Sequence, residues 1–160
     1  MEIYIIPSKA FWKYGYKIKG EDGSDRGIIK GQLMEIDKTV TVTSVAGNSR
    51  IAVHVGGLRT KLDISGGGKH IVIVRKPSLF NTRLDITGTS WTIKGVIENY
   101  DYKIVDGKKL IARVSDQGFF GRKILVQIEN PSDEVCVTAI VAALIACKDS
   151  RDQANNMNMI

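Results

Sequence analysis

The sequence has little cysteine, proline or histidine, and it does not begin with a long apolar segment. Two cysteines, three prolines and two histidines occur among 160 residues. Met1 to Pro7 lack the basic region and the long hydrophobic stretch of a secretory signal, so we expect a cytoplasmic protein. Hydrophobic residues make up 43% and charged residues 25% of the chain, which is typical of a globular domain and argues against a disordered or membrane-spanning class.

The two cysteines predict neither a disulfide nor a metal site. Cys136 and Cys147 lie in one predicted helix, where their spacing separates them by about three turns, or ~16 Å. That distance is too long for a disulfide between them. Because they stand in an apolar run without nearby histidines, we expect buried, reduced thiols.

Short segments of alternating hydrophobicity recur along the chain, and turns rich in Gly and Asp separate them. This pattern is typical of antiparallel hairpins, and the 16 glycines supply the positive φ angles that tight turns require. Five paired units are recognised, over residues 16–30, 40–55, 61–74, 83–96 and 102–114. With the segments 3–6 and 122–128 they predict about twelve strands in a closed antiparallel barrel.

A very apolar segment follows the last predicted strand. Between Val135 and Cys147 only Thr138 is polar, and Asn130 and Pro131 before it are typical of a helix start. Thirteen residues of helix span ~20 Å, too short for a bilayer of ~30 Å, so we expect the helix inside protein and no transmembrane segment. Four alanines would make this helix slim enough for a barrel interior: Ala139, Ala142, Ala143 and Ala146.

These patterns predict one domain over residues 1–149. Its fold class would be mainly β, with a central hydrophobic helix over about residues 132–148. Residues 150–160 show no periodicity and are expected to form a flexible tail.

The second half of the chain resembles the LURP-one-related family, a branch of the tubby-like superfamily to which phospholipid scramblases are also related. The similarity rests on the ordered segments Trp91 to Gly95, Tyr102 to Ile104, Leu110 to Ser115 and Ile124 to Ile128, followed by the apolar helix. It covers residues 83–149, and the first eighty residues only through the hairpin rhythm.

The resemblance implies a twelve-stranded tubby-like barrel closed around a C-terminal helix. It also associates the chain with a group whose members are linked to phosphoinositide binding, membrane-linked regulation, plant defence and lipid movement. The basic residues that hold a phosphoinositide in tubby proteins have no position-by-position match here, so the resemblance assigns no site residue.

Aromatic and basic residues occur together at residues 11–14 and 119–123, and Arg75 and Lys76 precede a proline. Such clusters are typical of lipid interfaces or of stacking on bases, or they close the ends of the barrel as corner residues. With a net charge of +6 they suggest attraction to anionic partners. The candidate residues for an anionic headgroup are Lys13, Arg75, Lys76, Arg122 and Lys123.

No catalytic residue, metal or cofactor is predicted. His54 and His70 are interpreted as ordinary strand residues, and Gly66 to Gly68 as a hairpin turn, since no P-loop lysine and serine follow. The leading hypothesis is a non-catalytic, cytoplasmic binding or regulatory barrel, peripheral to an anionic membrane surface or bound to another protein. A nucleic-acid-binding module, a lipid-scrambling or small-molecule-binding protein, and an enzyme acting at a barrel mouth remain alternatives.

Overall fold

A computed structural model of the chain describes residues 1–8, 14–31, 37–56, 59–75, 83–118 and 122–158. Twelve antiparallel strands close into a barrel in which each strand pairs with its neighbours in sequence, and β1 pairs with β12 to close the circle. The strands are β1 (Glu2–Pro7), β2 (Tyr14–Gly20), β3 (Asp25–Gly31), β4 (Asp37–Ser44), β5 (Gly47–Gly56), β6 (Arg59–Gly66), β7 (Lys69–Arg75), β8 (Arg83–Thr87), β9 (Trp91–Val96), β10 (Asp101–Asp106), β11 (Lys109–Asp116) and β12 (Ile124–Ile128).

The predicted strands and hairpins are confirmed. All five predicted units form neighbouring strand pairs, and the two outer segments become β1 and β12. The turn between β6 and β7 consists of Gly67 and Gly68, both with positive φ, so the glycine run is a hairpin turn as predicted.

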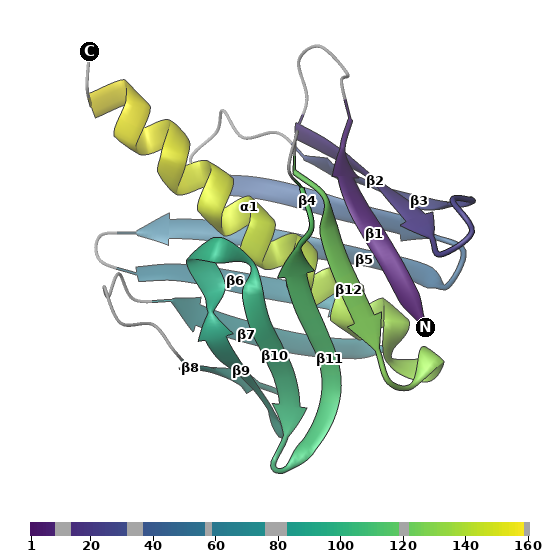
Figure 1. Ribbon diagram of the computed structural model, residues 1–160. Helices are drawn as coiled ribbons and strands as arrows, with labels where there is room; N and C mark the ends of the chain where they lie inside the picture. The colour runs from purple at the N-terminus through teal and green to yellow at the C-terminus, as the bar shows by residue number, and fades with distance from the viewer. Residues whose placement is uncertain (9–13, 32–36, 57–58, 76–82, 119–121, 159–160) are drawn as a thin grey trace.

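One helix, α1 (Glu134–Asn158), passes through the barrel, as Figure 1 shows. Its segment from Ala139 to Cys147 is buried on every side, and the inward side chains of the strands surround it. In β6, for example, Leu62 and Ile64 point inward and are 0% and 2% exposed. The predicted central helix is therefore confirmed, and its four alanines are all buried.

The start of the helix follows the sequence signals. The side chain of Asn130 accepts a hydrogen bond from the backbone N–H of Ser132 at 3.1 Å, and Pro131 begins a short 3-10 turn, η2 (Pro131–Asp133), that leads into α1. Glu134 accepts hydrogen bonds from the guanidinium of Arg26 at 2.8 to 3.1 Å, which ties the helix start to β3. This contact anchors the buried end of the helix to the barrel wall.

The predicted end of the helix is wrong. We expected it at about residue 148, whereas α1 continues to Asn158, so residues 150–158 are helical and not irregular. The hydrophobic pattern marks only the buried part of the helix. Most residues from 149 to 158 are polar in the sequence, so no hydrophobic periodicity marks this part of the helix. The mobility predicted for residues 150–160 stays a prediction.

Candidate anion-binding end of the barrel

The two ends of the barrel differ in what they contain. One end holds the start of α1 and the turns that follow β2, β4, β6, β8 and β10, whereas α1 leaves through the other end (Figure 1). We call this second end the helix-exit end and define it by Arg75, Glu98, Tyr100, Arg122 and Lys148. It contains the last residue of β7, the 3-10 turn η1 (Ile97–Asn99) between β9 and β10, and the residues just before β12.

Arg75 is a buried cation at the helix-exit end. Its side chain is 2% exposed, and its guanidinium forms an ion pair with the carboxylate of Glu98 in η1. A second guanidinium nitrogen lies 3.9 Å from the Sγ of Cys147 on α1. The Nε atom is buried and has no hydrogen-bond partner. A desolvated guanidinium with an unused donor is a strong potential ligand for an oxyanion.

Two further cations contact the aromatic ring of Tyr100 beside this pair. The guanidinium carbon of Arg122 lies 5.1 Å and the Nζ of Lys148 lies 4.8 Å from the ring centroid. Arg122 also donates a hydrogen bond to the hydroxyl of Tyr16 at 3.0 Å, and Lys148 donates one to the backbone oxygen of Glu98 at 2.7 Å. These cation–π contacts hold both side chains at the mouth of the barrel.

Tyr100, whose ring the two cations contact, has an uncommon backbone conformation. Its φ of 52° lies in the left-handed region, where it ends η1 and turns the chain into β10. Among the described residues other than glycine, no other has a positive φ. Such strain is typical of residues fixed by function or tight turns.

Three cations lie together among the described residues of the helix-exit end. Arg75, Arg122 and Lys148 are three cations, and Glu98, whose side chain is 48% exposed, is the carboxylate that contacts Arg75. The hydroxyl of Tyr102 is buried nearby without a hydrogen-bond partner, and burial raises the pKa of this phenol above its usual value. It remains a neutral donor. The arrangement favours an anionic ligand with several oxygen acceptors.

The structure brings together only part of the predicted headgroup residues. Arg75 and Arg122 both lie at the helix-exit end, although Arg75 is buried and not a surface cation as the sequence suggested. Lys123 is exposed and lies 4.6 Å from the ring centroid of Tyr4 on β1, away from Tyr100. Lys13 and Lys76 lie outside the described residues.

Lys123 lines a separate shallow cavity of about 350 Å³. Lys19 and Tyr4 also line it, so it combines two cations with an aromatic ring. Because Lys19 forms an ion pair with Asp25, its charge is already matched in part. This cavity is therefore a weaker candidate for anion binding than the helix-exit end.

Sequence reasoning missed three members of the helix-exit end, namely Glu98, Tyr100 and Lys148. Lys148 directly follows the apolar segment, where a cation suits the C-terminal end of a helix, so its position gave no separate sign of a binding site. Their common position depends on where α1 leaves the barrel and on the turn between β9 and β10. The sequence did hold one sign of an unusual connection. Glu98, Asn99 and Tyr100 separate two predicted strands, and no glycine stands among them.

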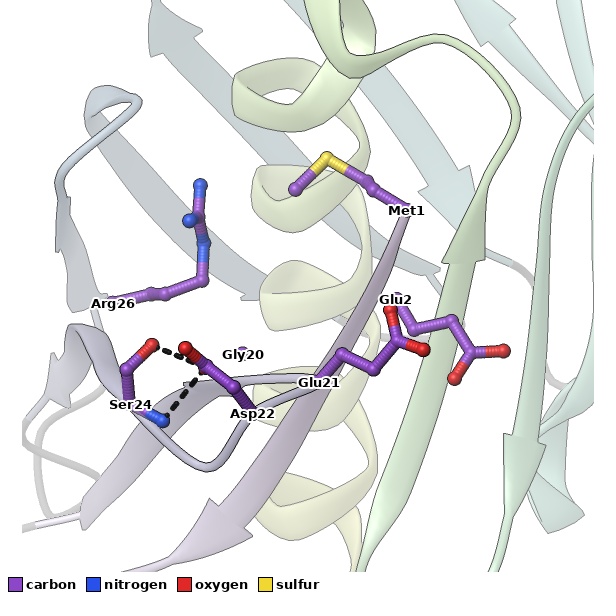
Figure 2. A pocket seen from close by; sticks show the side chains of 7 residues that line it. All are labelled: Met1, Glu2, Gly20, Glu21, Asp22, Ser24 and Arg26. Carbon is purple, nitrogen blue, oxygen red and sulfur yellow. Dashed lines mark hydrogen bonds between the residues drawn. The ribbon is translucent and has the colours of Figure 1, made fainter.

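The opposite end of the barrel has acidic character. Figure 2 shows a cavity of about 430 Å³ there, lined by Met1, Glu2, Gly20, Glu21, Asp22, Ser24 and Arg26. Asp22 accepts hydrogen bonds from the N–H and hydroxyl of Ser24 at 3.0 and 2.6 Å, and these bonds lower the pKa of its carboxyl group. Since Glu134 already binds Arg26, the cavity presents more negative than positive charge.

The other candidate residues do not form a catalytic or metal-binding arrangement in the part of the chain that the structure describes. His70 pairs with Asp63 on the outer face of β7 and β6, and His54 is exposed on β5. Cys136 and Cys147 are free, and burial raises the pKa of the Cys136 thiol. Among the described residues, no three His, Cys, Asp or Glu side chains are grouped so that they could hold a metal ion.

Neither α1, over its described residues, nor any other described helix has the length and the apolar character that a membrane-spanning helix needs.

Comparison with known proteins extends the similarity over almost the whole chain. A family model described as LURP-one-related matches residues 1–145, including the first half, where the sequence showed only the hairpin rhythm. The chain is also 22% identical over 148 residues to the uncharacterized protein YxjI of Bacillus subtilis (strain 168), covering 90% of this chain and 91% of that protein. No solved structure matches the chain.

Proposed function

The chain belongs to the LURP-one-related family, and we propose that its barrel is a non-catalytic binding or regulatory domain whose helix-exit end contacts anionic phospholipid headgroups. The observation that carries the proposal is the buried guanidinium of Arg75, whose Nε has no hydrogen-bond partner, beside two further cations, Arg122 and Lys148, that contact the ring of Tyr100. A phosphate oxygen would satisfy the unused Nε donor of Arg75.

The position of the cluster in the fold supports a surface ligand. The end of β7, the turn between β9 and β10 and the start of β12 lie together at the helix-exit end. There Arg122 and Lys148 contact the aromatic ring of Tyr100. Aromatic and basic side chains together are typical of surfaces that meet lipid headgroups.

The magnitude of the attraction agrees with reversible binding. Each Lys or Arg near an anionic membrane surface contributes about 1 kcal/mol, and salt screens this attraction over about 10 Å at 0.1 M. Three cations, offset in part by Glu98, therefore favour a contact that ionic strength and lipid composition regulate. The intracellular location predicted from the sequence is part of the same proposal.

The non-catalytic part of the proposal rests on what surrounds the titratable side chains. The imidazole of His70 contacts the carboxylate of Asp63 on the outer strand face, as an exposed cross-strand pair. At the helix-exit end the described polar side chains include cations, phenols and the carboxylate of Glu98, which pairs with Arg75, an arrangement that favours anion binding over proton transfer.

Co-sedimentation with vesicles tests the proposal. Wild-type protein is mixed with neutral phosphatidylcholine vesicles and with vesicles that also contain phosphatidylserine, at several salt concentrations. We expect recovery with the anionic vesicles alone, decreasing with salt, and about fivefold weaker binding for Arg122→Gln. Thermal unfolding of this variant checks that loss of the bond to Tyr16 leaves the barrel folded.

The matched control is Arg50→Gln. Arg50 is an exposed cation near the start of β5, close to the turn after β4 at the end of the barrel where α1 begins, so its removal changes the net charge equally. Equal recovery of wild-type protein with both kinds of vesicle, or equal loss in both variants, would exclude a headgroup site at the helix-exit end. A salt-dependent shift with labelled oligonucleotides but not with vesicles would favour the nucleic-acid alternative.

A further inference from the structure

Four cations face one another in register across the outer wall of β8 to β11. Arg83 on β8 pairs with Lys94 on β9, Lys94 pairs with Lys103 on β10, and Lys103 pairs with Arg113 on β11. All four side chains are exposed. With neighbouring strands ~4.8 Å apart, the row extends over ~14 Å. We call these four residues the cation ladder.

The cation ladder is unfavourable for the folded barrel by itself. Like charges directly opposite each other in an antiparallel pair destabilise it, in contrast to pairs of opposite charge. Within the described residues, Arg83 has a carboxylate partner in Asp85 at 3.3 Å, whereas no ion pair involves Lys94, Lys103 or Arg113. An external anionic surface would remove this repulsion.

The cation ladder lies close to the helix-exit end. Arg83 is the first residue of β8, and Lys94 and Lys103 are each two residues from the point where β9 ends and β10 begins. Val96, which ends β9 on the same outer face as Lys94, is 48% exposed. An exposed apolar side chain between a row of cations and the rim of the barrel matches the chemistry of a membrane interface.

The carboxylates on this wall do not interrupt the row. Asp85 pairs in register with Thr92, and Asp101 pairs with Val96, so both acidic side chains stand in the neighbouring rows. Beyond Arg113 the row continues with Gln127, which donates a hydrogen bond to Glu2 at 3.0 Å. Four successive strands therefore present only positive charge along this line.

We infer that the cation ladder is a second contact surface for an anionic lipid bilayer and sets the side on which the barrel lies when the helix-exit end binds. The inference rests on the proposed function, because both surfaces would meet the same bilayer. Nucleic acid is disfavoured as the partner. The aromatic side chains of β9, of β10 and of the connection between them, namely Trp91, Tyr102 and Tyr100, are buried, so none can stack on bases beside the ladder.

The test uses full-length protein and vesicles of phosphatidylcholine with or without phosphatidylserine. The ladder variant is the double substitution Lys94→Gln and Lys103→Gln, and the control variant is Lys30→Gln and Arg50→Gln. Lys30 and Arg50 are exposed and stand in one row on β3 and β5 with Thr41 between them. Lys30 lies six strands around the barrel from β9 and Arg50 five strands from β10, so the charge change is matched on a different wall.

We expect the ladder variant to bind anionic vesicles about 25-fold more weakly, since each cation near the surface contributes about fivefold, or ~1 kcal/mol. The control variant should bind within about twofold of wild type. Thermal unfolding should be unchanged or slightly higher in the ladder variant, because a repulsive pair is removed. A purely structural role for these lysines would lower the melting temperature.

The two proposals fail differently. If wild-type protein does not bind anionic vesicles at low salt, both the proposed function and the ladder inference are wrong. If wild type and the ladder variant bind equally while Arg122→Gln binds more weakly, the helix-exit site stands and the ladder inference is wrong. Equal losses in the ladder and control variants, or a ladder-dependent shift only with a labelled single-stranded oligonucleotide, would also overturn it.

Discussion

A charge placed inside the barrel tests the central position of α1. Ala143 is 0% exposed and lies in the middle of the buried helix segment. The substitution Ala143→Asp adds a carboxyl group where strand and helix side chains leave no water. Ala143→Asn adds a side chain of nearly the same size without the charge, so the difference between the two variants isolates the cost of ionisation.

The magnitude follows from the pKa of the introduced carboxyl group. Burial raises its pKa in the folded protein above the value of about 3.9 expected in the unfolded chain. Below pH ~3.9 the group is protonated in both states and ionisation costs nothing. As the pH rises, the unfolded state alone gains the charge, and the fold loses about 1.4 kcal/mol per pH unit until the folded-state pKa is reached, about 4 kcal/mol at pH 7.

Urea unfolding followed by circular dichroism at pH 4, 5, 6 and 7 measures this difference. We expect Ala143→Asp and Ala143→Asn to have similar free energies of unfolding at pH 4 and to diverge steadily towards pH 7. Thr43, an exposed residue on β4, supplies the control pair Thr43→Asp and Thr43→Asn, which should not diverge in this way. A constant difference at position 143 across the pH range would contradict a buried helix.

Three further predictions concern single contacts. Glu134→Gln weakens the charged hydrogen bonds to Arg26 and should lower the free energy of unfolding by about 1–3 kcal/mol in urea titrations; an unchanged midpoint would contradict this. Gly95→Ala should cost about 2 kcal/mol or more and lower the melting temperature, because φ is 131° and a Cβ would lie 2.6 Å from a backbone oxygen; wild-type melting would refute it. Glu98→Gln removes the carboxylate that competes for Arg75 and should strengthen binding to anionic vesicles about fivefold, whereas weaker binding would exclude competition.

The fold was predictable because its signals are local. Alternating hydrophobicity marks each strand, and turns such as Asp106 and Gly107 mark where a hairpin reverses. Asn130 and Pro131 mark the start of the helix in the same way. The helix end was not predictable, since the residues after Lys148 show no hydrophobic periodicity in the sequence.

The cation ladder was not predictable, because it depends on the exact pairing register. The turn at residues 107 and 108 pairs Asp106 with Lys109 and Val105 with Leu110, and this register would place Lys103 opposite Ala112. A β-bulge between Ile104 and Val105 shifts the pairing by one residue, so that Lys103 faces Arg113. The two cations therefore come together through an irregularity that the alternating pattern does not show.

The contrast between the two ends of the barrel supports the proposed anion site at the helix-exit end. Where α1 begins, the partly exposed cation Arg26 is bound by Glu134, and the neighbouring backbone groups are capped by Asn130. At the other end, the Nε of Arg75 and the hydroxyl of Tyr102 are buried without hydrogen-bond partners, which costs folding free energy. Groups left unsatisfied in an otherwise well-packed barrel are expected where a ligand completes the structure. An anion at this end would stabilise the native state by occupying donors that the chain itself does not satisfy, and its binding should therefore raise the melting temperature.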